Sequence, residues 1–307
     1  MITTPAPTTK PAQEETPLAR IQEFARSASF ETTRLTPAEL DEVKATAIPG
    51  CAIYVAAIPS RPLDEQIETA VGLRNRGFEP VPHLAVRNFE SAAAMETHLG
   101  RLVDNAGVRR ALVIAGDRPD PAGSVADALA GIESGVLQRC GLTEIGISGY
   151  PDGHPRITNV QLETALTAKL AAAHDAGLTV RIVTQFTMST KPIVNLVTRL
   201  RSQGISVPVS AGLAGPASMA TLLKFAKICG VKASAQGVAR NVGLLKSLIT
   251  ASTADPIVRA LAMNDELGEV NPHFFSFGGL PATVRWVMAA ANGRIKLNKE
   301  GFDILSK

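Results

Sequence analysis

Apolar residues gather in eight short, nearly continuous runs, and longer stretches with helical spacing of apolar positions separate these runs. Runs without strict alternation are typical of parallel strands that are covered on both faces. The runs occupy residues 27–33, 51–59, 79–86, 109–117, 144–151, 180–188, 206–215 and 273–279. The pattern therefore predicts parallel strands that alternate with helices.

The clearest amphipathic stretches cover residues 62–77, 159–177 and 191–204, and each ends with a glycine suited to a helix C-terminus. Eight strand–helix units are the number found in a (β/α)8 TIM barrel. A doubly wound sheet would usually show GxGxxG after its first strand, and this sequence has none. Residues 231–270 are a longer interval, which predicts extra helices before strand eight. The fold class is thus α/β, a TIM barrel with an insertion.

The chain of 307 residues is expected to hold one such barrel at 17–307, after a Pro- and Thr-rich tail at 1–16 that is expected to be disordered. No apolar run approaches the roughly 18 residues of a bilayer-spanning helix, and the first residues lack the apolar centre of a signal peptide. We therefore expect a cytoplasmic protein without a membrane partner.

Charge and cysteine content narrow the function further. The 31 basic and 28 acidic residues are interspersed, which argues against a nucleic-acid partner and fits a small anionic ligand. Three widely spaced cysteines without a CxxC pair argue against disulfides and zinc. Alanine-rich helices such as 168–177 are compatible with a homo-oligomer.

The active site of a TIM barrel lies at the C-terminal ends of its strands, so polar residues that end the apolar runs are the candidates. They are Glu31, His83, Asp117, Tyr150, Asp152, His154, Thr184, Gln185, Ser210 and Ser276. Two histidines and an aspartate could bind a metal, but none of them has the i, i+4 spacing of a helical metal motif, and no metal is predicted.

Glu31 carries the strongest signal, because a carboxylate beside Phe30 in an apolar strand is costly unless it is paired or used. We expect burial there to raise its pKa. For two other candidates a purely structural explanation is also available. His83 could be a core histidine that donates to a carbonyl, and Asp117 could form a turn or a helix N-cap.

Seven segments, one for almost every strand, together resemble the motifs of one family. They are SFE (29–31), VPHLAVR (81–87), AGDRP (115–119), GYPDGHP (149–155), DAG with VTQF (175–177 and 183–186), PVSAGLAG (208–215) and HFFSF (273–277). In this order they are similar to the strand-end motifs of the methylenetetrahydrofolate reductases, flavin-dependent TIM-barrel enzymes of one-carbon metabolism and methionine biosynthesis.

The resemblance implies a role for each matching residue. Glu31 would be the general acid that protonates the folate nitrogen as the methylene bridge opens, and Asp117 would bind the pterin and stabilise the cationic iminium. Gln185 and Phe275 would bind the tetrahydrofolate derivative. The cofactor FAD would lie along three further residues, which are His83, Tyr150 and His154.

The sequence also departs from the family pattern. Thr32 to Arg34 replace the aromatic and double-proline continuation of the first motif, and Ala56, Ala115 and Ala173 stand where threonine, arginine and lysine are common. Missing cationic partners weaken the binding of a pyrophosphate. The resemblance therefore supports folate binding more strongly than tight FAD binding.

The expected activity is the interconversion of 5,10-methylenetetrahydrofolate and 5-methyltetrahydrofolate by hydride transfer, with NAD(P)H as the hydride donor. Two alternatives stay open. One is the same chemistry without flavin, or run as oxidation of methyltetrahydrofolate. The other is a folate-binding barrel without turnover, and a barrel of unrelated chemistry is the residual, because a fold alone does not determine function.

Overall fold

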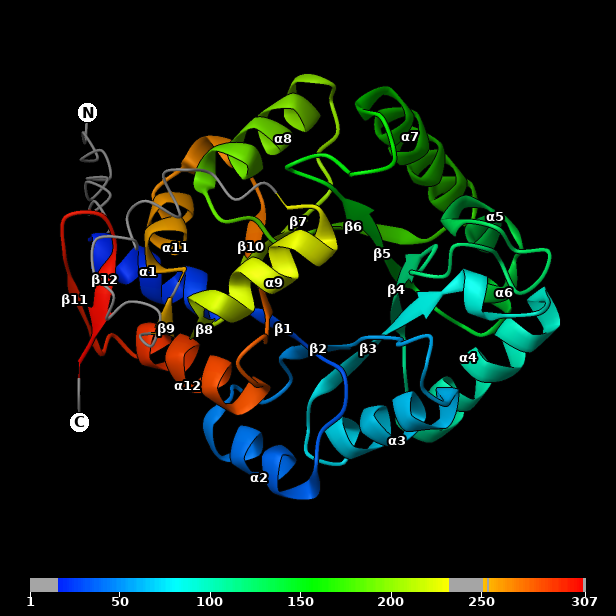
Figure 1. The fold of residues 1–307 in the computed structure, drawn as a ribbon, viewed down its shortest axis with the longest axis horizontal. Coiled ribbons are helices and arrows are strands. Elements are labelled where there is room, and N and C mark those ends of the chain that lie inside the picture. Colours follow the sequence, from blue (N-terminus) through cyan, green and yellow to red (C-terminus); the bar gives the residue numbers. More distant parts are fainter. Residues whose placement is uncertain (1–15, 232–250, 253, 306–307) are drawn as a thin grey trace, which may run out of the picture.

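Eight parallel strands close into a barrel in the order β1-β10-β7-β6-β5-β4-β3-β2 (Figure 1). The computed structural model describes residues 16–231, 251–252 and 254–305, so the tail expected at 1–16 lies almost wholly outside the described residues. The strands are β1 (Ser29–Thr32), β2 (Ala52–Val55), β3 (Glu79–Ala85), β4 (Arg110–Ile114), β5 (Glu144–Gly149), β6 (Thr179–Thr184), β7 (Val209–Ala214) and β10 (Val270–Phe275). Each overlaps one of the apolar runs, which confirms the TIM barrel.

A ring of helices surrounds the barrel. It contains α2 (Pro37–Thr46), α3 (Leu63–Arg74), α4 (Ala92–Ala106), α5 (Ala128–Glu133), the short α6 (Val136–Arg139), α7 (Asn159–Asp175), α8 (Thr190–Ser202), α11 (Asp255–Ala262) and α12 (Leu280–Ala291). α3, α7 and α8 confirm the three amphipathic predictions. The glycines that follow them, Gly77, Gly177 and Gly204, have φ values of +85°, +68° and +75°, which a side chain would strain.

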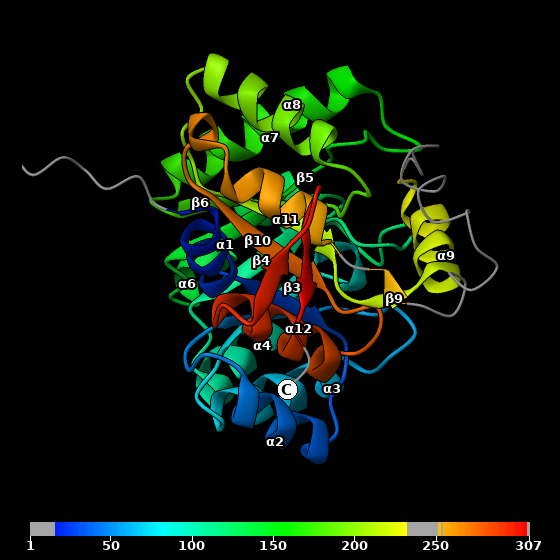
Figure 2. The same ribbon diagram turned by 90° about the vertical axis from the view of Figure 1, so that its left-hand side faces the viewer.

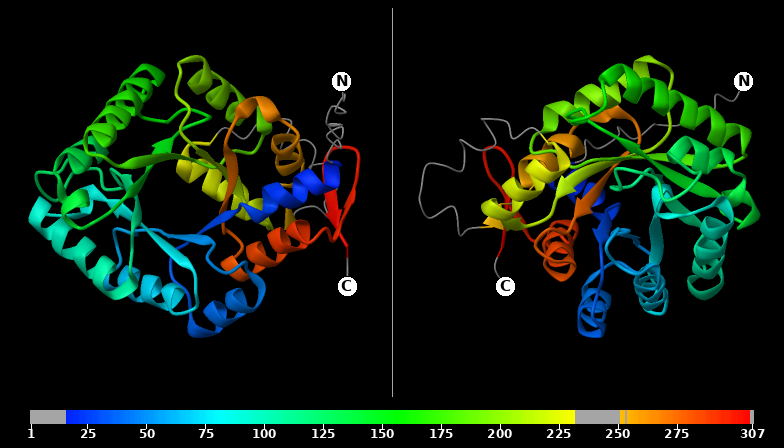
Figure 3. Two further views of the ribbon diagram at one scale, coloured as in Figure 1. Left: turned by 180° about the vertical axis from the view of Figure 1, so that it is seen from behind. Right: turned by 45° about the vertical axis from the view of Figure 1, so that its right-hand side comes forward.

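One helix precedes the barrel. α1 (Pro17–Arg26) packs against α11 and α12, and in Figure 3 it lies beside the C-terminal hairpin of β11 (Ile295–Leu297) and β12 (Phe302–Ile304). Two 3-10 turns, η1 (Val86–Asn88) and η2 (Asp265–Leu267), complete the connections. No helix among the described residues is both long enough and apolar enough to cross a bilayer.

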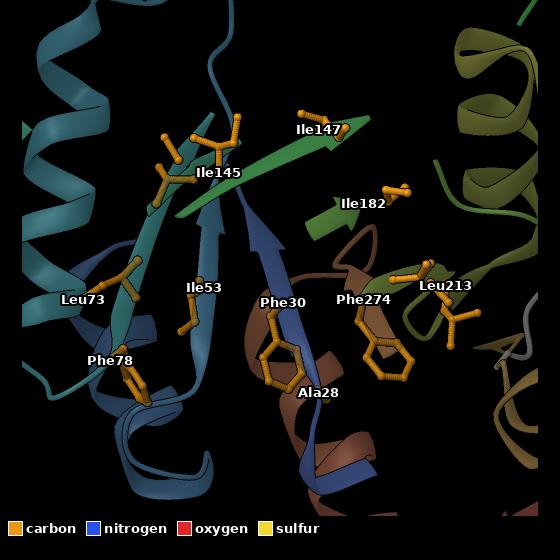
Figure 4. Close-up of a cluster of buried hydrophobic side chains, with 14 of the residues drawn as sticks. Ala28, Phe30, Ile53, Leu73, Phe78, Ile145, Ile147, Ile182, Leu213 and Phe274 are labelled. Atoms are coloured by element: carbon orange, nitrogen blue, oxygen red, sulfur yellow. The ribbon is translucent and has the colours of Figure 1, made fainter. Parts of the chain in front are cut away.

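The main core lies between the strands and the helix ring. Phe30, Ile53, Leu213 and Phe274 are each at most 1% exposed and belong to this layer (Figure 4). The rings of Phe30 and Phe274 stack with centroids 6.2 Å apart. Because side chains alternate along a strand, the neighbour of each of these residues points into the barrel.

An extra helix precedes strand eight, but it lies at residues 219–229, before the interval of 231–270 in which it was expected. After β7 the chain forms β8 (Ala217–Ser218) and α9 (Met219–Cys229), and β9 (Ala251–Ser252) pairs with β8. α9 lies across the end of the barrel rather than in the ring (Figures 1 and 2), and α11 packs beside α8 in the ring instead. The remainder of the insertion, 232–250, is outside the described residues.

The side chains of α9 and α11 explain why α11, and not α9, lies in the ring. α11 buries one apolar face that includes Ile257, Val258 and Leu261, as a barrel helix does. Phe225 of α9 instead stacks on Phe277, which follows β10, with ring centroids 4.3 Å apart. α9 is therefore the extra helix, and it covers aromatic residues at the strand ends.

A buried polar pair joins strands β2 and β3 to helices α3 and α4. Gln66 Nε2 donates to the carbonyl oxygens of Val55 and His83 at 2.9 and 3.0 Å, so Gln66 Oε1 must accept the hydrogen bond of 2.9 Å from His98 Nε2. His98 is 4% exposed. Burial, with a smaller effect of Arg101, lowers the pKa of His98 from 6.5 to about 4.

This histidine predicts a pH dependence of stability. Since its pKa is lower in the folded chain, the unfolded chain binds the proton first as pH falls below 6.5, and stability is lost between pH 6.5 and about 4. From pH 7 to 5 the wild type is expected to lose about 2 kcal/mol more of its free energy of unfolding than His98→Gln. Urea unfolding of both proteins at the two pH values measures the difference, and equal losses would refute the assignment.

Candidate active site

Glu31, near the C-terminal end of β1, lies between two buried histidines inside the barrel. Its Oε2 is 3.4 Å from His83 Nε2 and 3.5 Å from His273 Nε2. The side chain of Glu31 is 18% exposed, whereas His83 and His273 are 8% and 0% exposed. The contact with His83 lacks the alignment of a hydrogen bond, so His273 is the hydrogen-bond partner.

The histidines determine the protonation of this carboxylate. Burial acts to raise the pKa of Glu31, but the charge of His83 and the hydrogen bond from His273 outweigh it and lower the pKa from 4.5 to about 2. The expectation of a raised pKa is therefore wrong for the ligand-free protein. Its premise also fails, because Phe30 faces the helix layer and is not beside the carboxylate. Glu31 is an anion until a proton is brought to it.

His273 connects Glu31 to a second polar group below it. Its Nδ1 lies 2.9 Å from Ser29 Oγ. Because Nε2 donates to the Glu31 carboxylate, Nδ1 accepts from the Ser29 hydroxyl. Burial lowers the pKa of His273, and the hydrogen bond and charge of Glu31 oppose this only in part. The ring of Tyr54 packs edge-on at 4.6 Å. His273 is therefore a neutral imidazole in a fixed orientation.

His273 was not among the site residues predicted from the sequence. The predicted strand began at residue 273, which would place this side chain at the N-terminal end of the barrel and away from the site. β10 instead begins at Val270, three residues earlier, so His273 lies within the strand. The alternation of Asn271, His273 and Phe275 on one face was the signal that could have identified it.

Asp117, Tyr150 and His154 form a second group beyond β4 and β5. Asp117 is exposed. Burial raises the pKa of Tyr150, a hydrogen bond with Ser148 opposes this, and the charge of Asp117 adds to the increase. The rings of Tyr150 and His154 meet edge to face at 5.2 Å. His154 Nδ1 accepts from the backbone N–H of Arg156 at 3.2 Å, which holds the turn.

Glu31 and Asp117 both lie at the C-terminal ends of barrel strands, Glu31 in β1 and Asp117 three residues after β4. Burial raises the pKa of Cys229, at the end of α9, to about 11, and the charges of both Asp117 and Glu31 add to this. Both groups therefore lie within electrostatic range of one thiol. The structure thus brings Glu31 and Asp117 to one mouth of the barrel, from strands on different sides.

Gln185 and Phe275 line this mouth from β6 and β10. Gln185 Oε1 accepts from the backbone N–H of Phe186 at 3.0 Å, which orients the amide so that its nitrogen can donate to a ligand. Phe275 lies 5.6 Å from Phe186 and 5.7 Å from Phe277, ring centre to ring centre. At Gly212 a Cβ would lie 2.4 Å from the carbonyl oxygen of Thr184, so only glycine allows β7 to approach β6 here.

The described residues fit the ring of a flavin better than its pyrophosphate. Tyr150 and His154 offer a phenol and an imidazole beside each other at the strand ends. Lys169, 7% exposed in α7, is buried, and this burial lowers its pKa to about 8, although the charge of Asp127 opposes the shift. Ala115 and Ala173 provide no cation. Among the described residues no cluster of three or more His, Cys, Asp or Glu side chains could hold a metal ion.

Sequence comparisons with known proteins find matches in one family. The sequence model of the methylenetetrahydrofolate reductase family matches residues 64–245. The 5,10-methylenetetrahydrofolate reductase of Pectobacterium carotovorum subsp. carotovorum is 25% identical over 156 residues, which are 51% of this chain and 50% of the relative. That of Salmonella typhimurium is 26% identical over 162 residues, 52% of each chain. The chain spans about half the length of the curated relatives it matches.

A solved structure shares the fold. An uncharacterized protein from Clostridium thermocellum, described as binding two copies of 5-methyl-5,6,7,8-tetrahydrofolic acid, superposes with a TM-score of 0.54 at 14% identity. The superposition covers 88% of this chain and 96% of that one. At this identity the likeness shows the architecture alone.

Proposed function

The chain belongs to the methylenetetrahydrofolate reductase family, and from that membership we propose that it interconverts 5,10-methylenetetrahydrofolate and 5-methyltetrahydrofolate by hydride transfer. The observation that carries the proposal is the placement of Glu31. It faces two buried histidines on one side and shares the C-terminal mouth of the barrel with Asp117 on the other. The folate-binding description of the Clostridium thermocellum protein supports the same ligand class.

The residues of the site suit the steps of this reaction. As the methylene bridge opens, a carbon–nitrogen bond breaks, its electron pair stays on the nitrogen, and Glu31 supplies the proton for that nitrogen. The remaining iminium is a cation, and the Asp117 carboxylate stabilises it. Gln185 donates to the pterin and Phe275 stacks against the ligand. The iminium carbon then accepts a hydride and becomes the methyl group.

Glu31 must gain a proton before it can act as an acid. A folate that covers the mouth would remove its remaining contact with water, which raises the pKa of a carboxyl group. The neutral His273 donates to the carboxylate in a fixed direction, so the proton moves along an existing hydrogen bond. We propose that ligand binding and protonation of Glu31 are coupled in this way.

The hydride carrier is FAD in this proposal, with NAD(P)H as the donor, and flavin would supply two-electron transfer between the nicotinamide and the folate. Tyr150, His154 and His83 would lie along it. Because Ala115 and Ala173 replace common cationic partners, we expect FAD to bind weakly and to be lost on purification. Direct transfer from nicotinamide without flavin is the second candidate, and the same substitutions favour it.

An anaerobic turnover assay with 5,10-methylenetetrahydrofolate, with and without added FAD, tests the proposal. We expect a nearly colourless protein that forms 5-methyltetrahydrofolate from NADH or NADPH only when FAD is added. Equal rates without FAD would support the flavin-free reaction. Binding of 5-methyltetrahydrofolate without turnover in either direction, with any donor, would refute the enzyme and support a folate-binding barrel.

A further inference from the structure

Midway along the strands, the barrel interior is apolar on the side of β2 to β6 and polar on the side of β1, β7 and β10. Tyr54, Val81, Leu112 and Val183 form a small cluster inside β2 to β6. On β1, β7 and β10, a different set of inward residues is small or polar: Ser29, Ser210, Gly212, Asn271 and His273. The interior of a TIM barrel is normally filled by branched apolar side chains. On β1, β7 and β10 of this barrel, small and polar side chains stand in place of branched apolar ones.

A cavity of about 310 Å³ enters the barrel from its N-terminal end, opposite the candidate active site. Exposed Arg26, Ser27 and Gly50 lie at its rim, and its inner end is lined by Ser29 and by Ser210, which is 2% exposed. A polar cavity of this volume has room for several water molecules, each bound by two or more polar groups. Water can therefore reach Ser29 from the N-terminal face.

Ser29 is also the group that donates to His273. One imidazole thus spans the barrel from the cavity to the carboxylate, with Nδ1 2.9 Å from Ser29 Oγ and Nε2 3.5 Å from Glu31 Oε2. The residues pair across neighbouring strands, Ser29 with His273 and Glu31 with Phe275, so the backbone holds this arrangement. The cavity and the active site are thus connected by a chain of hydrogen bonds.

Other charged and titratable groups lie on both sides of this hydrogen-bonded chain. On the cavity side Arg110 and Arg181 form ion pairs with Glu144 at 3.6 and 3.7 Å, and burial raises the pKa of Tyr54 to about 12. On the site side His83 of β3 is another titratable group beside Glu31, with Nε2 3.4 Å from Oε2, and the charge of Glu31 also acts on Cys229 at the end of α9.

We propose that the N-terminal cavity is the proton entry for Glu31, so that water there recharges the acid through Ser29 and His273 while a folate covers the C-terminal mouth. This inference rests on the proposed function and adds a route and a positioning residue, Ser29, to it. The physical reason is the access of water to the Glu31 carboxylate. A ligand that excludes water from the reacting atoms also covers the face of the carboxylate that is open to the C-terminal mouth.

The transfer is balanced by O–H and N–H bonds alone. Nε2 of His273 gives its proton to Glu31, Nδ1 takes the hydroxyl proton of Ser29, and Ser29 takes a proton from water in the cavity. One proton from the N-terminal solvent has then reached Glu31. After the product leaves, Glu31 takes a proton from water at the open mouth and passes it to Nε2, Nδ1 returns its proton to Ser29, and Ser29 releases one proton to the cavity water, which restores the first tautomer.

Ser29→Val and Ser29→Thr form a matched pair of variants, since they have the same shape and differ only in the hydroxyl. Asn271→Leu places an apolar side chain in the cavity lining and leaves both Ser29 and His273 unchanged. We expect formation of 5-methyltetrahydrofolate in a single turnover to slow at least about tenfold in Ser29→Val and in Asn271→Leu, and by less than about threefold in Ser29→Thr. Flavin reduction by NAD(P)H and the Kd for 5-methyltetrahydrofolate are expected to change less than about twofold in all three.

Nuclear magnetic resonance gives a readout that does not depend on turnover. With 5-methyltetrahydrofolate bound, the ring N–H of His273 is expected to exchange with water at least about tenfold more slowly in Ser29→Val than in Ser29→Thr. Equal exchange, or equal single-turnover rates for these two variants, would overturn the route. A wild type that forms no 5-methyltetrahydrofolate would instead refute the proposed function. Slowing in Ser29→Val but not in Asn271→Leu would overturn the cavity as the entry.

Discussion

Glu31→Gln is expected to slow formation of 5-methyltetrahydrofolate by a factor of about 10²–10⁴, which is the usual contribution of a positioned general acid. The amide has nearly the shape of the carboxyl group but cannot give up a proton. Flavin reduction by NAD(P)H needs no proton from this residue, so its rate is expected to stay within about twofold of wild type. Stopped-flow measurement of the two half-reactions separates these effects.

Glu68→Gln is the matched control, because Glu68 is an exposed glutamate on α3, in the outer ring of helices. It is expected to leave both half-reactions unchanged. Full folate turnover in Glu31→Gln would exclude Glu31 as the acid. A loss of both half-reactions together would instead show that the substitution damages the site as a whole, and binding of 5-methyltetrahydrofolate reports that directly.

Asp117→Asn is expected to lower the same folate rate by a factor of about 10²–10³, as the loss of one charged or hydrogen-bonding stabiliser of a transition state commonly does. In the proposed mechanism the carboxylate of Asp117 faces a cation, and the amide of the variant has no net charge. Since the cation exists only during the reaction, the effect is expected in kcat more than in KM. Steady-state kinetics with varied folate distinguishes the two.

Asp120→Asn provides the comparison within the same turn, since Asp120 is also exposed and three residues away. Its kinetics are expected to match those of the wild type. The pKa of Tyr150 offers a second measurement, because the charge of Asp117 contributes to raising it. Removing that charge is expected to lower the phenol pKa, and an unchanged titration of Tyr150 would place Asp117 away from the site.

Several details of the site could not be derived from the order of residues. Phe30 follows Ser29 and precedes Glu31, and the sequence alone suggested that its ring surrounds the carboxylate. Strand geometry sends neighbouring side chains to opposite faces, so Phe30 packs with Phe274 in the outer core. The pKa of Glu31 is consequently decided by His83 and His273, which are 52 and 242 positions away along the chain.

The N-terminal end of β10 and the position of α9 also could not be predicted from local sequence patterns. Pro272 and Asn271 weaken the strand pattern, yet both pair with β7 because the barrel closes there. α9 and α11 are both apolar enough for the ring, and only the aromatic residues above the strands decide which one covers the mouth. Local patterns cannot distinguish these outcomes, since each depends on partners that are distant in sequence.

What the sequence determined by itself was the repeating unit. Continuous apolar runs, helical stretches that end in glycine and a polar residue after most strands are local patterns, and local physics is sufficient to predict a barrel with Glu31, Asp117 and Gln185 at one end. Only the tertiary structure decided the protonation of Glu31, the inclusion of His273 and Ser29, and the polar cavity beneath them. Charge, burial and solvent access depend on distances through space, and closure of the barrel is what establishes those distances.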